Sequence, residues 1–340
     1  MRPVSEDELQ RAASMVVRSC LKVTAGERLA LIGDAESLSL VAALESAGRD
    51  AGAEVNVLRV DQLRSYSTNH TGERPHKVLP DGVRRAMLSA AASVFLATGP
   101  HSETSMREQL LHIVGACKVR HAHMPGITPL AFATGLSCDF AKLGEVGRSI
   151  AGRLETAREI VCESTDGSRL VVRGSRRWVT RLGDVGPGES VTLPAGSIFT
   201  SPESVSGKLV ATSIGEFFGT REGLLKDPVV FEVLEGVVMN VTSPSNPDLV
   251  RDIENMLHVA PQSDRVGLAV IGVNDAIGPP TGDVSVDQHR PGLHLVFGDP
   301  LGKITGAPWS ARTSFAVCQG KGSVRIDGTL IADDGRLTIA

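Results

Sequence analysis

Residues 285–300, SVDQHRPGLHLVFGDP, set histidines and aspartates immediately before an apolar run. Asp287, His289, His294 and Asp299 fall within thirteen residues, and His294 opens the apolar segment. This pattern predicts a polar loop that enters a short buried strand, with His294 at its mouth. Histidine and carboxylate side chains serve metal binding and acid–base catalysis. The structural alternative is a polar loop with one hydrogen-bonded core histidine.

The bulk properties indicate a globular protein with two domains. The chain has 340 residues, 41% of them hydrophobic and 22% charged, as in a globular protein. This length exceeds what usually folds around one hydrophobic core. A net charge of −4 gives no broad basic surface, so we expect no nucleic-acid partner. No apolar run reaches the roughly 18 residues that a membrane helix needs, so no membrane association is expected. The five cysteines lie apart, without a CxxC pair, and no signal peptide is evident, which favours reduced thiols in a cytoplasm.

The N-terminal half alternates strands with helices. We expect strands at residues 28–32, 53–60, 93–98 and 118–123, and helices at 36–50, 83–90 and 106–114 between them. That alternation predicts a doubly wound parallel sheet wrapped by helices. His101 follows the third strand, at the carboxyl edge where such sheets bind ligands. No GxGxxG or GxxxxGK[ST] pattern supports a nucleotide site.

The C-terminal half is rich in short β segments. Strands are expected at 158–162, 169–173, 208–213, 229–233, 237–241, 266–273, 294–297, 315–317 and 322–326. Asp-Gly and Glu-Gly pairs between them are typical hairpin turns. We therefore predict an α/β domain over residues 1–157 and a mostly antiparallel β domain over residues 158–340, packed together around a cleft.

Several motifs, in order, resemble the aminopeptidase T family of metallopeptidases and the related 2,5-dihydroxypyridine dioxygenases. They are HMPGIT at 123–128, LPAGSIFTSPE at 193–203, GVN at 272–274 and GLHLVFG at 292–298. The resemblance implies the same two-domain fold. Glycine and proline punctuate these motifs, so the match concerns backbone geometry before chemistry.

The resemblance also implies metal ligands that this chain lacks. In the peptidases the position of Ser197 is a glutamate ligand, and that of Leu268 is a second glutamate. A histidine and an aspartate are best aligned with Thr313 and Phe315, which leaves His294 alone. The dioxygenases place their iron on the positions of Leu268, Thr313 and Phe315. Because a catalytic zinc needs about three protein ligands, we expect no metal cofactor.

Three functions remain open. The first is a small-molecule enzyme without the family's metal, using acid–base chemistry centred on His294. The second is a metal-dependent hydrolase, aminopeptidase-like or amidase-like, with a divalent metal relocated to Asp287, His289 and His294, with Asp283 and Asp299 nearby. The third is a non-catalytic descendant that binds a ligand or partner.

The expected site follows from these hypotheses. The catalytic candidates are His294, Asp287, His289 and Asp299. The substrate-binding candidates are His101, Glu203, Arg265, Asn274, Arg290, Trp309 and Arg312. Cys318 is interpreted as a buried thiol. Strand edges in the β-rich half favour a homodimer or larger homo-oligomer.

Overall fold

The computed structural model describes residues 3–63, 67–68, 76–98, 104–215 and 217–339. The chain divides into two compact units. One comprises Met1–Ala141 with Gly183–Ala195, and the other comprises Lys142–Leu182 with Gly196–Ala340. Each unit is described by itself.

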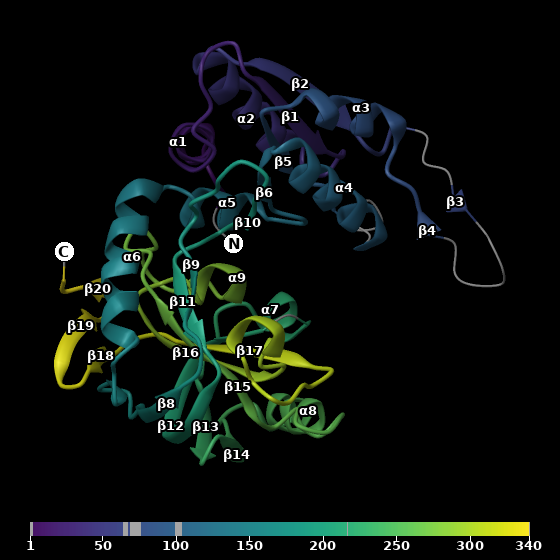
Figure 1. The fold of residues 1–340 in the computed structure, drawn as a ribbon. Helices are drawn as coiled ribbons and strands as arrows, with labels where there is room; N and C mark the ends of the chain where they lie inside the picture. Colours follow the sequence, from purple (N-terminus) through teal and green to yellow (C-terminus); the bar gives the residue numbers. More distant parts are fainter. Residues whose placement is uncertain (1–2, 64–66, 69–75, 99–103, 216, 340) are drawn as a thin grey trace. The chain divides into compact units, whose positions relative to one another are not determined.

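The first unit contains a parallel sheet with the strand order β10-β6-β5-β1-β2 (Figure 1). Its strands are β1 (Arg28–Gly33), β2 (Glu54–Arg59), β5 (Ala92–Phe95), β6 (Arg120–His123) and β10 (Ser190–Thr192). Its helices are α1 (Glu6–Met15), η1 (Val16–Cys20), α2 (Leu38–Asp50), α3 (Asp81–Ser89), α4 (Thr104–Cys117) and α5 (Pro129–Gly135). The short strands β3 (Ser67–Thr68) and β4 (His76–Lys77) pair separately. The predicted parallel sheet is confirmed.

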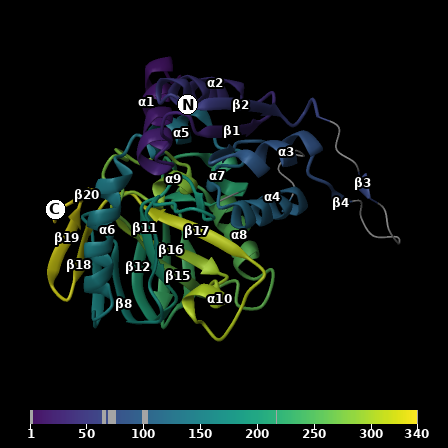
Figure 2. The ribbon, with the colours of Figure 1, turned by 45° about the horizontal axis from the view of Figure 1, so that its top comes forward.

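The second unit contains a 13-stranded sheet whose pairings are antiparallel. The main path runs β20-β19-β18-β7-β8-β12-β17-β16-β15-β11-β9, and Figure 2 labels β8, β12, β15, β16 and β17 of its central part. β13 pairs with β12, and β14 pairs with β13 (Figure 1). The strands are β7 (Glu159–Glu163), β8 (Arg169–Ser175), β9 (Val179–Arg181), β11 (Ser197–Thr200), β12 (Pro202–Ile214), β13 (Val229–Leu234), β14 (Val237–Thr242), β15 (Val266–Gly272), β16 (Gly292–Gly298), β17 (Ser314–Gln319), β18 (Ser323–Ile326), β19 (Thr329–Asp333) and β20 (Arg336–Leu337). The helices are α6 (Phe140–Leu154), α7 (Phe217–Glu222), α8 (Pro247–Leu257), α9 (Val284–Asp287) and α10 (Gly302–Thr305).

The predicted hairpin turns form as their chemistry requires. Glu235, Asp327 and Asp334 have positive φ angles, and each is followed by a glycine that also has positive φ. Two consecutive residues of positive φ match the twist of antiparallel strands. The predicted β-rich half is therefore confirmed in class.

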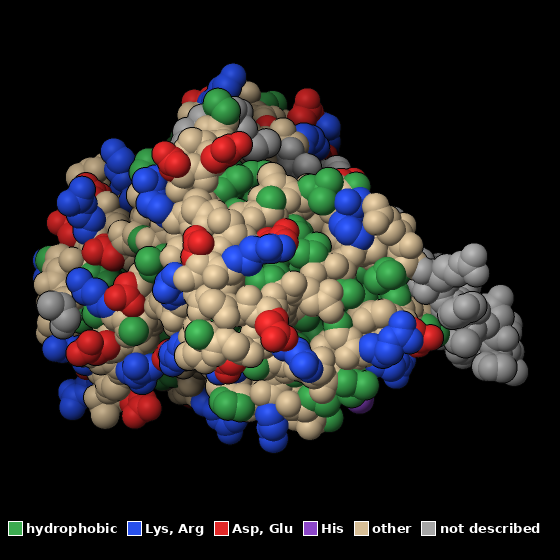
Figure 3. All heavy atoms as spheres, turned by 90° about the horizontal axis from the view of Figure 1, so that it is seen from above, with side chains coloured by type: hydrophobic (Ala, Val, Ile, Leu, Met, Phe, Trp, Pro, Cys, Tyr) green, Lys and Arg blue, Asp and Glu red, His purple; other side chains and the backbone are tan. Residues whose placement is uncertain are grey.

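The chain leaves the second unit and returns to it. Residues 183–195 contribute β10 to the edge of the parallel sheet, beside β6. The proposed domain boundary at residue 157 stays a prediction; the compact units change at residues 141/142, 182/183 and 195/196. Within the described residues, no helix is long and apolar enough to cross a membrane. On the face shown in Figure 3, the described acidic and basic side chains are interspersed.

The core of the second unit includes an aromatic cluster. Phe297 is fully buried, and its ring centroid lies 5.4 Å from that of Phe231 and 6.3 Å from that of Phe315. These rings come from β16, β13 and β17, so they join strands that are distant in sequence.

We predict that Phe297→Ala lowers the free energy of unfolding by about 3–5 kcal/mol, because it leaves a cavity in this cluster. Met239→Ala is the control, since that side chain is 63% exposed. Both tryptophans, Trp178 and Trp309, belong to the second unit. Their fluorescence during urea unfolding therefore measures the effect. Equal unfolding free energies for the two variants would contradict the packing.

Candidate functional site

His294 lies on one face of the antiparallel sheet, and the ladder register shows what shares that face. Val270 is paired with His294, Phe199 with Val270, and Val179 with Phe199. Directly opposed residues of antiparallel strands point to the same side. We call this side of β9, β11, β15, β16 and β17 the His294 face.

The His294 ring is held by the backbone. His294 is 1% exposed. Its Nε2 lies 3.0 Å from the carbonyl oxygen of Arg290, and its Nδ1 accepts from the N–H of Gln319 at 3.2 Å. These partners require a neutral ring with its proton on Nε2. Burial lowers the pKa of His294 to about 4, against the hydrogen bond to Arg290 that raises it. Both nitrogens are therefore used by the fold, as the structural alternative expected.

Asp287 does not orient His294. It is 2% exposed, and its carboxylate accepts from the N–H and Oγ1 of Thr281, both at 2.8 Å. It also accepts from the N–H of Gly282 at 2.9 Å and from the hydroxyl of Ser213. This carboxylate ties α9 to β12 and to the loop before α9.

Asp299, Glu203 and Arg312 are not hydrogen-bond partners of His294, whose two ring nitrogens are bonded to Arg290 and Gln319. Asp299 is five residues further along the chain, about 16 Å at the rise of an extended strand. Its carboxylate accepts from the N–H of Leu301 at 3.1 Å. Glu203 and Arg312 are exposed. His101 lies outside the described residues.

Arg290 is a structural residue in this arrangement. It is 6% exposed, and its guanidinium donates to the carbonyls of Gly278 and Gly320, each at 2.7 Å, and of Asp334 at 3.2 Å. Burial lowers the pKa of Arg290, against the charges of Asp287 and Asp334 that raise it. The predicted role in binding substrate would require breaking these bonds.

Arg265 and Trp309 meet, although 44 positions separate them in the sequence numbering. The guanidinium carbon of Arg265 lies 4.7 Å from the centroid of the Trp309 ring. Both residues are partly exposed. The pair is a cation–π contact at the surface of the second unit.

His289 differs from the other candidates. It is 5% exposed, and its buried Nδ1 has no hydrogen-bond partner within the described part of the chain. The backbone holds the residue in place, because Asn274 donates its N–H to the His289 carbonyl at 2.8 Å. Burial, followed by the nearby charge of Arg181 and by His294, lowers the pKa of His289 to about 3. Asn274 is itself fully buried.

A glycine allows the His289 turn to fold over the sheet. A Cβ on Gly272 would lie 1.9 Å from the Arg290 carbonyl oxygen and 2.8 Å from the His289 carbonyl carbon. Gly272 is paired with Ser197, and Ser197 with Arg181. Adjacent strands are about 4.8 Å apart, so the Arg181 backbone lies about 10 Å from the strand beneath His289. An arginine side chain spans much of that distance.

Arg181 is a candidate that the sequence reasoning missed. It is exposed, on β9, and its guanidinium carbon lies 5.1 Å from the centroid of Phe199. Only the ladder register places it beside Ser197 and in line with Gly272, two strands away, because nothing in its local sequence marks it. We call His289, Asn274, Ser197 and Arg181 the His289 corner.

The positions of the expected metal ligands carry no ligand set. Leu268 packs in an apolar cluster with Phe199, Val270 and Val296. Phe315 is paired with Phe297, and so points away from the His294 face.

The two neighbours of Phe315 in β17 are on the other side of the strand. Ala316, paired with Val296, and Ser314, paired with Gly298, are on the His294 face. Neither offers an imidazole or carboxylate. Among the described residues, no group of three or more His, Cys, Asp or Glu side chains is placed to hold a metal ion. The residues present do not fit the metal that the resemblance implies.

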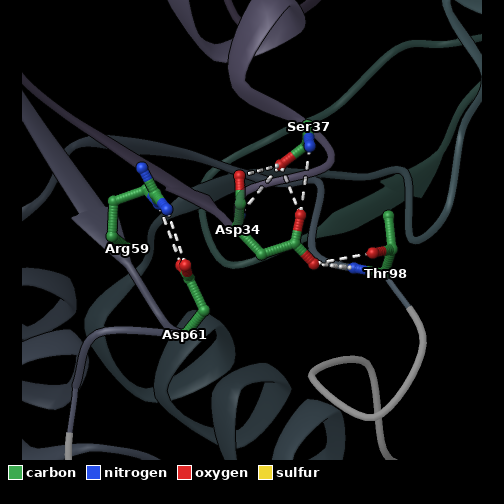
Figure 4. Close-up of polar contacts among 5 residues, drawn as sticks. All are labelled: Asp34, Ser37, Arg59, Asp61 and Thr98. Carbon is green, nitrogen blue, oxygen red and sulfur yellow. Dashed lines mark hydrogen bonds and ion pairs between the residues drawn. The ribbon is translucent and has the colours of Figure 1, made fainter.

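The carboxyl edge of the parallel sheet carries a closed polar cluster (Figure 4). Asp34 follows β1 and accepts from the N–H and Oγ1 of Thr98, at 2.5 and 2.8 Å, and from the N–H and Oγ of Ser37, at 3.1 and 2.9 Å. Burial raises the pKa of Asp34, but these bonds outweigh it and the pKa is lowered. Arg59 pairs with Asp61 through two bonds, at 2.9 and 2.6 Å. The cluster joins β1 to the chain after β5 and leaves the Asp34 carboxylate saturated.

Two solved structures are similar to the whole chain. The 2,5-dihydroxypyridine dioxygenase from Pseudomonas putida KT2440 has 17% sequence identity and a TM-score of 0.64, covering 99% of each chain. Wild-type AmpT from Thermus thermophilus has 15% identity and a TM-score of 0.63, covering 98% of this chain and 100% of that one. The chain shares their fold. No family model and no curated protein matches it. The predicted fold relationship is confirmed.

We predict that Gly272→Ala lowers the unfolding free energy by about 3 kcal/mol or more, because the added methyl group meets backbone atoms. Gly152→Ala in α6 is the matched control, since a Cβ there meets nothing within 4 Å. Alanine in a helix should be neutral or stabilising by up to about 1 kcal/mol. Urea unfolding measures both, and tolerance of alanine at 272 would contradict the close approach of the His289 turn.

We predict that stability falls as the pH is lowered from 7 to 4. The unfolded His294 ring has a pKa near 6.5, and the folded one about 4, so the unfolded chain binds more protons in this range. The loss is on the order of 3 kcal/mol for this ring. Urea unfolding at several pH values should show a shallower pH slope in His294→Gln. The exposed-residue control, His258→Gln, should keep the wild-type slope, and equal slopes in all three proteins would refute the buried neutral ring.

Proposed function

We propose that the chain is an enzyme that processes a small organic molecule, and that His289 supplies its imidazole. The carrying observation is the buried Nδ1 of His289, which has no hydrogen-bond partner in the described part of the chain. The side chains of His294 and Asp287 are occupied by bonds within the fold. Among the predicted catalytic histidines, His289 is therefore the one with a nitrogen to offer a substrate.

The cost of this arrangement supports a functional role. A buried polar atom without a partner destabilises a protein by about 1–3 kcal/mol. Among the described residues, ten buried side-chain atoms have no hydrogen-bond partner, and the His289 Nδ1 is the one that belongs to a predicted catalytic residue. The backbone bond from Asn274 fixes the position of His289, so little reorganisation would accompany binding.

The pKa of about 3 favours one kind of chemistry. At neutral pH the His289 ring is uncharged and is a weak base. A neutral imidazole in a dry site donates its N–H to a substrate oxygen on which negative charge develops. We therefore propose a hydrogen-bond donor role at a carbonyl or carboxyl group, in place of the acid–base role first expected of His294.

The alternative hydrolase with relocated metal ligands has less support. The Asp287 carboxylate is hydrogen-bonded to Thr281 and Ser213, and both His294 nitrogens are bonded to backbone groups.

The five cysteines are free thiols in the structure, which agrees with the proposed cytoplasmic location. Assembly as a homo-oligomer stays a prediction.

We predict opposite phenotypes for the two histidines. His289→Gln should reduce kcat by about 100-fold or more, with unfolding free energy near that of the wild type. His294→Gln should lower the unfolding free energy by about 2 kcal/mol, because two buried backbone groups lose their partner.

The assay uses a panel of aminoacyl amides, hydroxypyridines and small carboxylic acids, with thermal unfolding measured in parallel. The aminoacyl amides and hydroxypyridines are chosen from the names of the two similar structures, and the carboxylic acids represent a broader class of small organic molecule. Undiminished turnover in His289→Gln, or no turnover of any panel member by the wild type, would contradict the proposal. A protein that binds panel members without turnover would instead be the non-catalytic descendant.

A further inference from the structure

We infer that Arg181 and His289 form a subsite for the carboxylate of a monoanionic ligand. The inference rests on the proposed function only in taking that ligand to be the enzyme's substrate. Arg181 is the last residue of β9.

The register puts the Arg181 backbone and the His289 turn at the same end of the His294 face. Arg181, Ser197 and Gly272 are consecutive partners across β9, β11 and β15. The His289–Arg290 turn lies directly over Gly272, where a Cβ would meet it. The intervening Ser197 is a small side chain, so the arginine is not blocked from the turn. The charge of Arg181 acts on His289, as this proximity requires.

Both groups lack protein partners. The side chain of Arg181 makes no hydrogen bond or ion pair within the described residues, and its guanidinium lies over Phe199. A guanidinium stacked on a ring keeps its N–H edge free for a planar acceptor. By contrast, the guanidinium of Arg290 donates hydrogen bonds to three backbone carbonyls. The buried Nδ1 of His289 is likewise unpartnered.

Charge selects the ligand class. The corner offers one positive charge, because Arg181 is ionised and the His289 ring is neutral at pH 7. A carboxylate matches that charge and can accept two parallel bonds from a guanidinium. A phosphate dianion brings a second negative charge that no described side chain of the corner balances. A neutral amide would forgo the ionic part of the attraction.

The test titrates the full chain with acetate, acetamide and inorganic phosphate at constant ionic strength. The chain carries nitrogen-15 in its histidine rings, and the His289 signals are assigned by their loss in His289→Gln. Acetate should shift the His289 ring nitrogens saturably, acetamide should not, and phosphate should bind more weakly than acetate. Arg181→Gln should weaken acetate binding about tenfold or more.

Two further variants sharpen the result. Arg181→Lys keeps the charge but not the planar fork, so its acetate affinity should fall between those of the wild type and Arg181→Gln. Arg84→Gln, at an exposed position of α3, should leave acetate binding unchanged. Wild-type affinity in Arg181→Gln, equal shifts with acetamide, or no shift of the His289 signals would overturn the subsite.

These outcomes are separable from those of the proposed function. Arg181-dependent acetate binding together with full turnover in His289→Gln would sustain the subsite and refute the catalytic role. Loss of turnover in His289→Gln, together with acetate binding that is unchanged in Arg181→Gln, would sustain the catalytic role and refute the subsite.

Discussion

The turn between α9 and β16 depends on side chains that bind backbone carbonyls. Arg290 donates to three carbonyls, and His294 joins the Arg290 carbonyl to the N–H of Gln319. Each bond satisfies a buried polar group that would otherwise be costly. Because the polar atoms of these two side chains are hydrogen-bonded within the fold, they are not free to bind a substrate. The same turn places the His289 backbone over Gly272. The Nδ1 of His289 has no hydrogen-bond partner within the described residues.

Burial also decides the charge state of the histidines. His121, His123, His289 and His294 all have lowered pKa values, and burial is the first cause in each case. In the first unit, His121 lies between Ser93 and His123, at 2.8 and 3.1 Å. A neutral imidazole has one N–H donor and one acceptor nitrogen, so a neutral ring can bond to a neighbour on each side. These four buried histidines are thus neutral at pH 7, and among the described histidines only His289 has a buried ring nitrogen without a hydrogen-bond partner.

The sequence predicts the elements better than the site. Alternating strands and helices up to β6, and Asp-Gly turns after β7, follow from local chemistry, so both sheets were foreseeable. β10 was missed because three residues carry little periodic signal, and its place beside β6 is a long-range pairing. The roles of Asp287 and Arg290 could not be read from composition, because their partners Ser213 and Gly320 are distant in the chain. Likewise, only register shows that Phe315 faces away from His294.

The pairing of Arg181 with Ser197 decides the charge at one end of the His294 face. A carboxylate at position 197 would lie opposite Arg181 in the ladder, and an opposed carboxylate and guanidinium stabilise each other and neutralise the arginine. This chain has a serine there, and Leu268, further along the same face, packs in an apolar cluster. The positive charge of Arg181 therefore has no carboxylate opposite it in the ladder, and a surface with such an uncompensated charge attracts anions.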